Sequence, residues 1–275
     1  MTALAIIPAR FASTRFPGKP VAAETGKYLI QHVYERAAAA RRVDRVIVAT
    51  DDTRIADAVA SFGGEAVMTR ADHATGSERI AEVVAGLCSD PKASTDLIVN
   101  VQGDEPEIDP RHLDALVELL ETDPGAQVGT LACPFAVIPG SDPRDPNAVK
   151  VVVSAGGRAI YFSRSLIPYP RGHEASGGTL PPHAQGAPAG GRTHQPAPYL
   201  LHVGVYAYRP AFLARLGTLA PTPLERTEQL EQLRWLEHGF AIAVRIVDGA
   251  NKGIDTPEDY AAFVERCRQA GAGRG

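Results

Sequence analysis

Short apolar runs alternate with segments of helical periodicity through the first half of this chain. The apolar runs predict strands at Ala3–Ile7, Arg45–Ala49, Glu65–Met68, Leu97–Val101 and Val128–Cys133. The segments between them predict helices at Tyr28–Ala40, Thr53–Phe62, Ser77–Leu87 and Arg111–Glu121. Such strict alternation favours a mostly parallel sheet whose crossover connections are right-handed. The sequence therefore predicts an α/β fold.

The second half of the chain has a different pattern. It predicts a β-hairpin followed by further strands and helices, at Val149–Val153, Ala159–Ser163, Leu200–Tyr208, Pro210–Leu216, Glu225–Glu237, Ile242–Ile246 and from Pro257 onward. Residues 171–198 are rich in Gly, Pro, Ala and His, a composition that builds no packed core. We interpret them as an inert insertion loop, with a mobile cover over a site as the alternative. We expect a single domain over residues 1–275, with a disordered tail at 268–275.

The composition excludes several function classes. The 275 residues carry a formal net charge of −4, whereas a general nucleic-acid binder needs a broad excess of Lys and Arg. No apolar run approaches the length that spans a bilayer, and the N-terminus lacks the features of a signal peptide. The three cysteines, Cys88, Cys133 and Cys267, form no CxxC pair and fit a reducing compartment. We expect a cytoplasmic protein with no nucleic-acid or membrane partner.

The loop after the first strand is strongly basic. We expect Pro8 to end that strand, and Arg10, Arg15 and Lys19 follow among small residues. Small residues let backbone N–H groups approach an anion closely, and the cations neutralise it. An open α/β sheet binds ligands beyond the carboxyl ends of its strands, so this loop predicts a phosphate site. A solvated basic loop without a ligand is the alternative.

Two acidic positions far apart in the sequence favour a divalent cation. Asp104 lies in the sequence Gln-Gly-Asp-Glu directly after a predicted strand. Asp255 precedes Thr256, and we expect Thr256 to cap the last helix, with Pro257 at the first helical position. Mg²⁺ prefers one or two protein carboxylates together with phosphate oxygens and water. For Asp104, a cluster of acidic residues that caps a helix before Pro106 is the alternative.

Three more segments carry polar side chains of uncertain role. Residues 70–79 run from a predicted strand into a helix N-terminus, which can bind an anion or a polar edge, or be a plain cap. His202 and residues 223–231 are candidates for contact with an acidic substrate, although the latter also fit an ordinary amphipathic helix. The first strand is not followed by GxGxxG, and the sequence contains neither GxxxxGK[ST] nor GxSxG. The absence of these motifs disfavours a dinucleotide-binding oxidoreductase, a Walker-type NTPase and an esterase with a nucleophilic serine.

Taken together, the motifs resemble one family. IIPARFASTRFPGKP, VIVATDD, MTRADHATGSER, NVQGDEP, PNAVKVV, YFSRSLIPY, LHVGVYAYR, PTPLERTEQLEQLR and GIDTPEDY, in this order, resemble the 3-deoxy-manno-octulosonate cytidylyltransferase family. The resemblance covers roughly Ala3 to Arg266, apart from the insertion. It implies a Rossmann-like nucleotide-diphospho-sugar transferase fold with a mostly parallel central sheet and an additional β-hairpin and dimerisation region. It also implies CTP and Kdo as substrates, Mg²⁺ as cofactor and a homodimer.

The resemblance also assigns roles to individual residues. It implies nucleotide contacts at Pro8, Ala9, Arg10, Ser13, Arg15, Lys19, Arg70 and Ser77. It implies Mg²⁺ ligands at Asp104 and Asp255, which together with Arg10 and Lys19 form the catalytic set. It implies sugar-acid contacts at Arg79, Gln102, His202 and Glu225.

The implied reaction is attack by the C2 hydroxyl of Kdo on the α-phosphorus of CTP, for lipopolysaccharide biosynthesis. Alignment and charge neutralisation dominate such a transfer, and no covalent enzyme intermediate is required. Cytidylyltransferases for sialic acid or 8-amino-Kdo remain alternatives, because one pocket contact can separate related sugars. A catalytically silent CTP-binding module is a further alternative.

Overall fold

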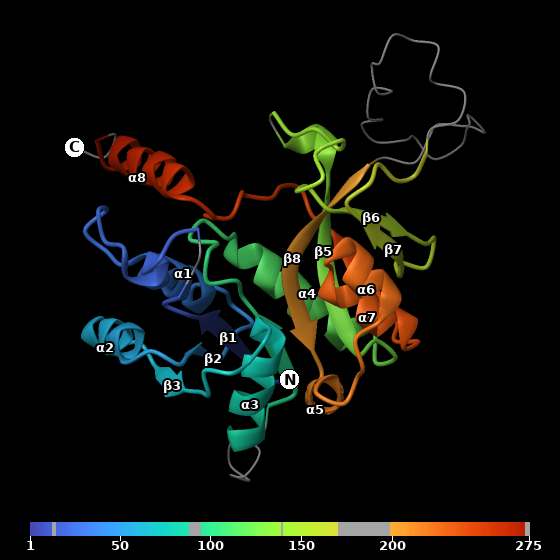
Figure 1. The fold of residues 1–275 in the computed structure, drawn as a ribbon, viewed down its shortest axis with the longest axis horizontal. Helices are drawn as coiled ribbons and strands as arrows, with labels where there is room; N and C mark the ends of the chain where they lie inside the picture. The colour runs from blue at the N-terminus through green and yellow to red at the C-terminus, as the bar shows by residue number, and fades with distance from the viewer. Residues whose placement is uncertain (13–14, 88–94, 139, 170–198, 273–275) are drawn as a thin grey trace. The chain divides into compact units, whose positions relative to one another are not determined.

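The structure is a computed structural model that describes residues 1–12, 15–87, 95–138, 140–169 and 199–272 (Figure 1). Two compact units share these residues, and the single domain expected over residues 1–275 stays a prediction. The first unit comprises Met1–Gly129, Val205–Thr218 and Asn251–Gly275, and the second comprises Thr130–Gly204 and Leu219–Ala250. The segments interleave because strands β5 and β8 each contribute residues to both units. Local sequence periodicity carries no information about such interleaving.

A mostly parallel sheet forms the centre of the first unit. Its strands are β1 (Ala3–Ala9), β2 (Arg45–Thr50), β3 (Ala66–Met68) and β4 (Leu97–Asn100), in the order β3-β2-β1-β4. Strand β1 pairs in parallel with β2 and with β4. The end of β8 (Leu200–Tyr208) adds an antiparallel neighbour to β4. The predicted α/β class with a mostly parallel sheet is confirmed.

The helices of the first unit each bury an apolar face. They are α1 (Leu29–Ala38), α2 (Thr53–Ser61), α3 (Gly76–Leu87), α4 (Pro110–Thr122), α5 (Pro210–Leu216) and α8 (Pro257–Ala272), with the short 3-10 helix η1 (Lys19–Val21). Figure 1 shows α1 and α2 beside the β1–β3 part of the sheet. Strand β1 is almost entirely buried, as a central parallel strand covered on both faces must be.

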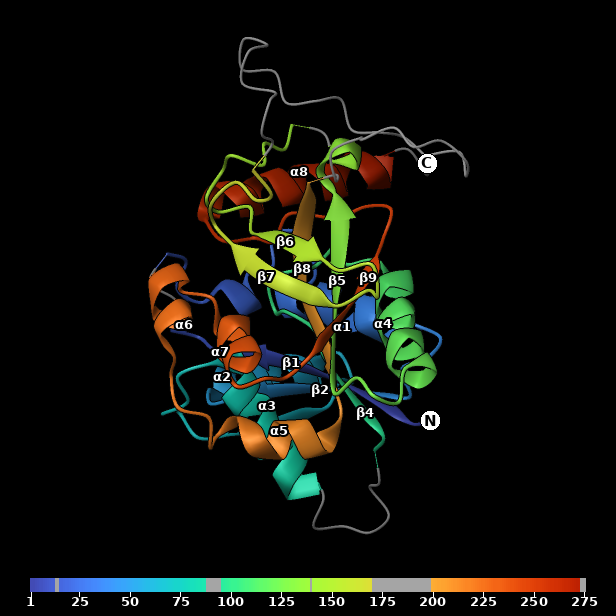
Figure 2. The ribbon, with the colours of Figure 1, turned by 90° about the vertical axis from the view of Figure 1, so that its right-hand side faces the viewer.

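The second unit contains the predicted hairpin. Strands β6 (Lys150–Val153) and β7 (Ala159–Ser163) pair antiparallel and lie side by side in Figure 2. The turn between them contains Gly157 at φ 72°, in the left-handed region that glycine tolerates. The unit also holds most of β5 (Val128–Pro134), η2 (Phe135–Val137), α6 (Pro223–Glu228), α7 (Glu231–Glu237) and β9 (Ile242–Ile246).

Three sequence predictions differ from the structure. Strand β1 continues through Pro8 to Ala9, because a proline near the end of a strand removes only one ladder hydrogen bond. The single helix expected at Glu225–Glu237 is broken by Gln229, whose left-handed φ of 53° separates α6 from α7. The tail expected at 268–275 is helical as far as Ala272, because α8 continues through Gly271. The insertion, Cys88 and Ser13 lie outside the described residues.

Candidate active site

A cavity of about 260 Å³ lies beyond the carboxyl ends of β1 and β4, within the first unit. Nine of the residues predicted for the site line it: Pro8, Ala9, Arg10, Arg15, Lys19, Arg79, Gln102, Asp104 and Asp255. Parallel neighbours end at the same edge of a sheet, so β1 delivers the basic loop and β4 delivers Asp104 to one place. This edge is where open α/β sheets bind their ligands.

The two strand ends approach closely because residue 103 is a glycine. A Cβ atom on Gly103 would lie 2.9 Å from the carbonyl oxygen of Pro8. Likewise, a Cβ on Gly76, the first residue of α3, would lie 3.1 Å from Cγ of Pro8. Glycines at these two positions let three backbone segments converge on the floor of the cavity.

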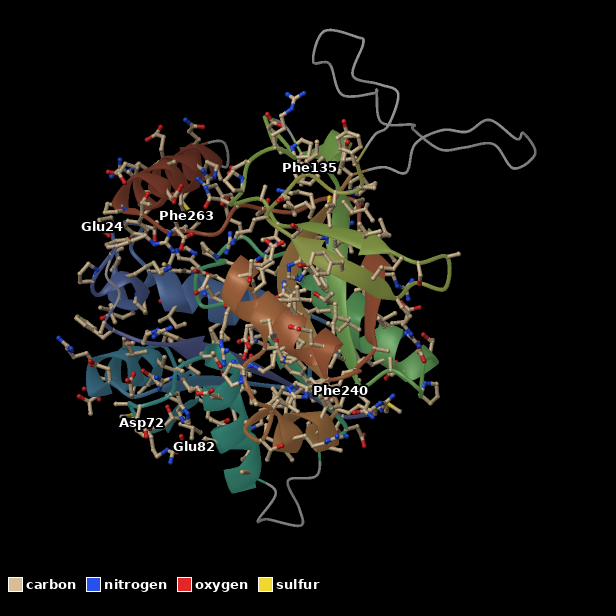
Figure 3. All side chains as sticks on the ribbon, turned by 45° about the vertical axis from the view of Figure 1, so that its right-hand side comes forward. Glu24, Asp72, Glu82, Phe135, Phe240 and Phe263 are labelled. Atoms are coloured by element: carbon tan, nitrogen blue, oxygen red, sulfur yellow. The ribbon has the colours of Figure 1, made fainter. Side chains whose placement is uncertain are left out.

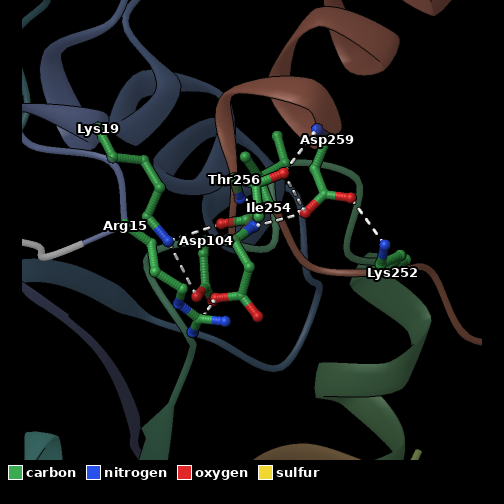
Figure 4. A network of polar contacts seen from close by, with 8 residues as sticks. Arg15, Lys19, Asp104, Lys252, Ile254, Thr256 and Asp259 are labelled. Atoms are coloured by element: carbon green, nitrogen blue, oxygen red, sulfur yellow. Dashed lines mark hydrogen bonds and ion pairs between the residues drawn. The ribbon is translucent and has the colours of Figure 1, made fainter. Parts of the chain in front are cut away.

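Lys19 joins the basic loop to both acidic segments. Its Nζ donates to Oδ2 of Asp104 at 3.1 Å and to the carbonyl oxygen of Ile254 at 2.6 Å (Figure 4). The backbone N–H of Ile254 in turn donates to the carbonyl oxygen of Asp104 at 2.8 Å. The Lys19 side chain is only 14% exposed, so its charge acts where water screens weakly. This contact places the segment before α8 directly beside Asp104.

The turn that carries Asp255 is held from its other side by Asp259. Oδ2 of Asp259 accepts the backbone N–H groups of Asp255 and Thr256 at 3.2 and 3.1 Å. Oγ1 of Thr256 accepts the N–H of Asp259, so Thr256 caps α8 as predicted. Oδ1 of Asp259 accepts from the exposed Lys252 (Figure 4). The side chain of Asp255 therefore remains available to the cavity, where Arg15 Nη2 contacts it at 2.8 Å.

Apolar packing fixes this turn in the first unit. Ile254 is buried with Leu29 of α1 and with Tyr260 and Phe263 of α8. The hydroxyl of Tyr260 also accepts the backbone N–H of Glu24, which Figure 3 labels near Phe263. Asp255 thus follows a residue whose position is set by a hydrophobic cluster.

The capping alternative for Asp104 is wrong. Helix α4 begins at Pro110 and its cap is Asp109, whose side chain accepts the N–H of Arg111. Asp104 instead faces the cavity beside Lys19. Its neighbour Glu105 is half-buried, and burial together with the Asp104 charge raises the pKa of Glu105 to about 8. Glu105 therefore binds its proton more tightly than an exposed glutamate does.

The residues of the cavity suit a divalent cation that is shared with an anionic ligand. Among the described residues, no three His, Cys, Asp or Glu side chains group closely enough to hold a metal by themselves. Asp104 and Asp255 supply two hard carboxylates, with side chains 33% and 47% exposed. Mg²⁺ accepts such a pair when phosphate oxygens and water complete its shell. Four cationic side chains in the same lining suit an anionic ligand.

Some predicted nucleotide residues do not line the cavity. Arg70 is 68% exposed and contacts Asp72 at 3.4 Å, while Ser77 is buried in the first turn of α3. Arg79, from the same segment, is buried and lines the cavity, with Nη2 3.4 Å from Asp51.

Two residues predicted to contact the sugar acid belong to the second unit. The imidazole of His202 contacts Thr130 Oγ1 at 3.1 Å, and burial lowers its pKa to about 3. Glu225 forms the capping box of α6 with Thr222 and a bidentate ion pair with Arg234, at 2.8 and 2.5 Å. Burial acts to raise the pKa of Glu225, but the hydrogen bonds from Arg234 and Thr222 lower it overall.

Sequence reasoning did not single out five lining residues: Pro20, His73, Thr75, Gly76 and Gly103. His73, Thr75 and Gly76 lie within the segment 70–79 that the sequence identified as polar. The sequence did not show which of its side chains face the cavity, because that depends on how the loop is held against α3.

The comparisons with known proteins agree with this geometry. A family model described as cytidylyltransferase matches residues 4–246. The chain is 50% identical to the 3-deoxy-manno-octulosonate cytidylyltransferase of Syntrophotalea carbinolica, over 94% of this chain and 96% of that protein. It is 47% identical to the enzyme of the same name from Syntrophobacter fumaroxidans, over 99% of this chain and 100% of that protein.

A solved structure supports the same relationship. CMP:2-keto-3-deoxy-manno-octonic acid synthetase complexed with CTP superposes with a TM-score of 0.83 at 39% identity, covering 98% of this chain and 100% of that chain. The 4-diphosphocytidyl-2C-methyl-D-erythritol synthase of Anaerococcus prevotii, at 12% identity and a TM-score of 0.58 with 97% and 98% coverage, shares the fold. Within the part of the chain that the structure describes, no helix is both long and apolar enough to cross a bilayer.

Proposed function

The chain belongs to the 3-deoxy-manno-octulosonate cytidylyltransferase family, and from this membership we infer that it activates Kdo with CTP. It is a nucleotidyltransferase, and its products are CMP-Kdo and pyrophosphate. The observation that carries this function at the level of residues is the shared cavity. Three cations from the opening loop and two carboxylates from distant segments line it together. We further propose a role for each of these residues.

The basic loop is proposed to bind the triphosphate. Arg10, Arg15 and Lys19 line the cavity after β1, at the edge of the sheet where phosphate ligands bind. Arg10 and Lys19 are the main residues that neutralise the negative charge that develops on the phosphates as pyrophosphate leaves. Lys19 suits this role because the Asp104 carboxylate and the Ile254 carbonyl already orient its Nζ.

Asp104 and Asp255 are proposed to hold Mg²⁺. Bound there with CTP, the ion would neutralise phosphate charge and lower the pKa of the attacking hydroxyl. Each carboxylate has a cationic partner in the structure, Lys19 for Asp104 and Arg15 for Asp255. When CTP and Mg²⁺ bind, phosphate oxygens would become partners of the two cations and the ion a partner of the two carboxylates, so no charge would lose its partner. The exchange avoids leaving a carboxylate or a guanidinium desolvated and unpaired.

The reaction follows from this arrangement. The C2 hydroxyl of Kdo releases its proton to solvent and forms a bond to the α-phosphorus, while the bond from that phosphorus to the pyrophosphate oxygen breaks. The chain's contribution is to align the two substrates and to neutralise charge, so no covalent enzyme intermediate is needed.

The sugar acid is proposed to contact Arg79 and Gln102. Both line the cavity, and the buried guanidinium of Arg79 suits a carboxylate. His202 and Glu225 remain predictions for the same role. A homodimer, a cytoplasmic location and a role in lipopolysaccharide biosynthesis are likewise proposed from the family.

The function is tested by pyrophosphate release from each of the four nucleoside triphosphates with Mg²⁺ and an acidic sugar. We expect turnover with CTP and Kdo, and little with sialic acid. Faster turnover with 8-amino-Kdo or sialic acid would reassign the substrate. CTP binding without turnover on any sugar would identify a silent module.

A further inference from the structure

His73 is a lining residue that none of the roles above uses. It lies in the loop between β3 and α3, and its side chain is only 6% exposed. Its Nε2 is hydrogen-bonded to Glu82 of α3, which is not among the residues that line the cavity. Figure 3 labels Glu82 on α3 and Asp72 on the preceding loop. One edge of the imidazole is therefore engaged away from the cavity.

The partner of His73 determines how its two nitrogens are used. The hydrogen bond from His73 lowers the pKa of Glu82 and the N–H of Arg70 lowers it further, although burial acts to raise it. Glu82 is thus an ionised carboxylate, which can only accept. Nε2 of His73 must donate to it, and in the neutral ring Nδ1 then carries a lone pair. With Nε2–H donating to Glu82, the second nitrogen of the neutral imidazole is an acceptor and not a donor.

Helix α3 holds the whole loop that carries this imidazole. Glu82 also accepts the backbone N–H of Arg70 at 3.1 Å. One turn earlier, Glu78 accepts the N–H of Ala74 at 2.9 Å, and its own N–H donates to Thr75 Oγ1 at 3.2 Å. The orientation of His73 is therefore set before any ligand binds, as expected for a residue that recognises one.

A hydrogen-bond acceptor at Nδ1 of His73 can contact only a part of the nucleotide that carries a hydrogen-bond donor. A triphosphate offers only acceptors, and three cations of the loop after β1, Arg10, Arg15 and Lys19, line the cavity and suit it. The nucleoside part offers donors, namely the amino group of the base and the ribose hydroxyls. We propose that His73, oriented by Glu82, accepts a hydrogen bond at Nδ1 from such a donor of CTP. This inference rests on the proposed function and makes Glu82 a positioning residue.

Two substitutions separate ligand recognition from a merely structural role. In His73→Asn the amide oxygen is bonded to Cγ, as Nδ1 is, so an acceptor is retained where Nδ1 lies. In His73→Gln the amide nitrogen reaches toward the position of Nε2 and can still donate to Glu82, but the Nδ1 acceptor is lost. For a single lost hydrogen bond we expect His73→Gln to raise the Kd and KM for CTP by about 2- to 10-fold. We expect His73→Asn to stay near wild type, and kcat to change little in both.

The measurements are CTP titration by calorimetry and steady-state kinetics, with Asp72→Ala as a control. Asp72 is 74% exposed and is not a lining residue, so its removal should leave both constants unchanged. If His73→Asn weakens CTP binding while His73→Gln does not, His73 only pins the loop and the proposal is overturned. Normal constants in both variants overturn it as well.

Nucleotide analogues identify the donor and resolve the case in which both variants bind weakly. UTP lacks the amino group, and the 2′- and 3′-deoxy forms of CTP each lack one hydroxyl. For one of these three, wild type and His73→Gln should bind equally, because the contact is already missing. If His73→Gln weakens the binding of all three analogues as much as it weakens the binding of CTP, the proposal is overturned. Absence of wild-type turnover with CTP and Kdo would instead refute the proposed function.

Discussion

Replacing Gly103 by alanine should damage the site through a single added carbon. The Cβ atom would lie 2.9 Å from the carbonyl oxygen of Pro8, whereas ordinary contacts begin at 3.4 Å. The shortfall is about 0.5 Å, and neither partner is a flexible side chain, so backbone must move. Residue 103 adjoins Asp104, and Pro8 precedes the basic loop. The displacement therefore occurs between the proposed metal ligand and the proposed phosphate clamps.

The size of the effect follows from that displacement. Overpacking of this kind costs about 1–3 kcal/mol of stability. For a chain of this size, that corresponds to a fall in Tm of roughly 2–10 °C. A misplacement of about 1 Å can cost a hundredfold in rate, so half of it should lower kcat/KM about tenfold.

Two other glycines provide matched controls in the same unit. A Cβ on Gly64 would lie 2.6 Å from the ring of Phe62 and 2.8 Å from Val59, away from the cavity. Gly64→Ala should therefore lower Tm without changing kcat/KM. Gly86 lies in α3 with nothing within 4 Å of its Cβ position, so Gly86→Ala should be neutral or stabilise by up to about 1 kcal/mol.

The assays are thermal unfolding and pyrophosphate release with CTP, Mg²⁺ and Kdo, run on all three variants. Gly103→Ala with wild-type Tm and kcat/KM would refute the close approach of the two strand ends. An equal kinetic loss in Gly64→Ala would show that general strain, not displacement at the site, determines the rate.

Three further predictions follow from the same contacts. Asp104→Asn should lower kcat by about a hundredfold or more while circular dichroism stays native, and normal turnover at saturating Mg²⁺ would remove Asp104 from the site. Asp259→Ala should cost about 1 kcal/mol of helix-cap stability and raise the Mg²⁺ concentration needed for half-maximal activity, because the Asp255 turn loses its acceptor. Asp259→Asn keeps an acceptor, and Lys252→Ala removes a contact only from the other carboxylate oxygen, so both variants should keep the wild-type stability and Mg²⁺ requirement. If Asp259→Ala also keeps them, Asp259 does not hold the Asp255 turn. Burial lowers the pKa of His202 from 6.5 to about 3, so the unfolded chain binds the proton first and the free energy of unfolding should fall as pH drops from 6.5 toward 3. His202→Gln should weaken that dependence in urea denaturation at several pH values, and an unchanged dependence would assign the acid sensitivity to other groups.

Local patterns in the sequence were enough to predict most of the elements. Strand β8 (Leu200–Tyr208), helix α5 (Pro210–Leu216) and strand β9 (Ile242–Ile246) have the predicted bounds. Their apolar periodicity and flanking breakers act over a few residues, which is the range that sequence reasoning reads well. The break at Gln229 was not predictable in this way, because a left-handed glutamine has no sequence signature.

The sequence by itself determined the α/β class, the basic loop and the two acidic motifs, since each depends on neighbours in the chain. Tertiary structure decided which of these side chains meet. Ile254 and Asp104 are far apart in sequence, and only the pairing of β1 with β4 and the packing of α8 on α1 bring them together. It also decided that His73, and not Arg70, faces the cavity, because Glu78 and Glu82 of α3 fix the loop between them. Contacts between distant segments depend on packing, and local periodicity does not encode it.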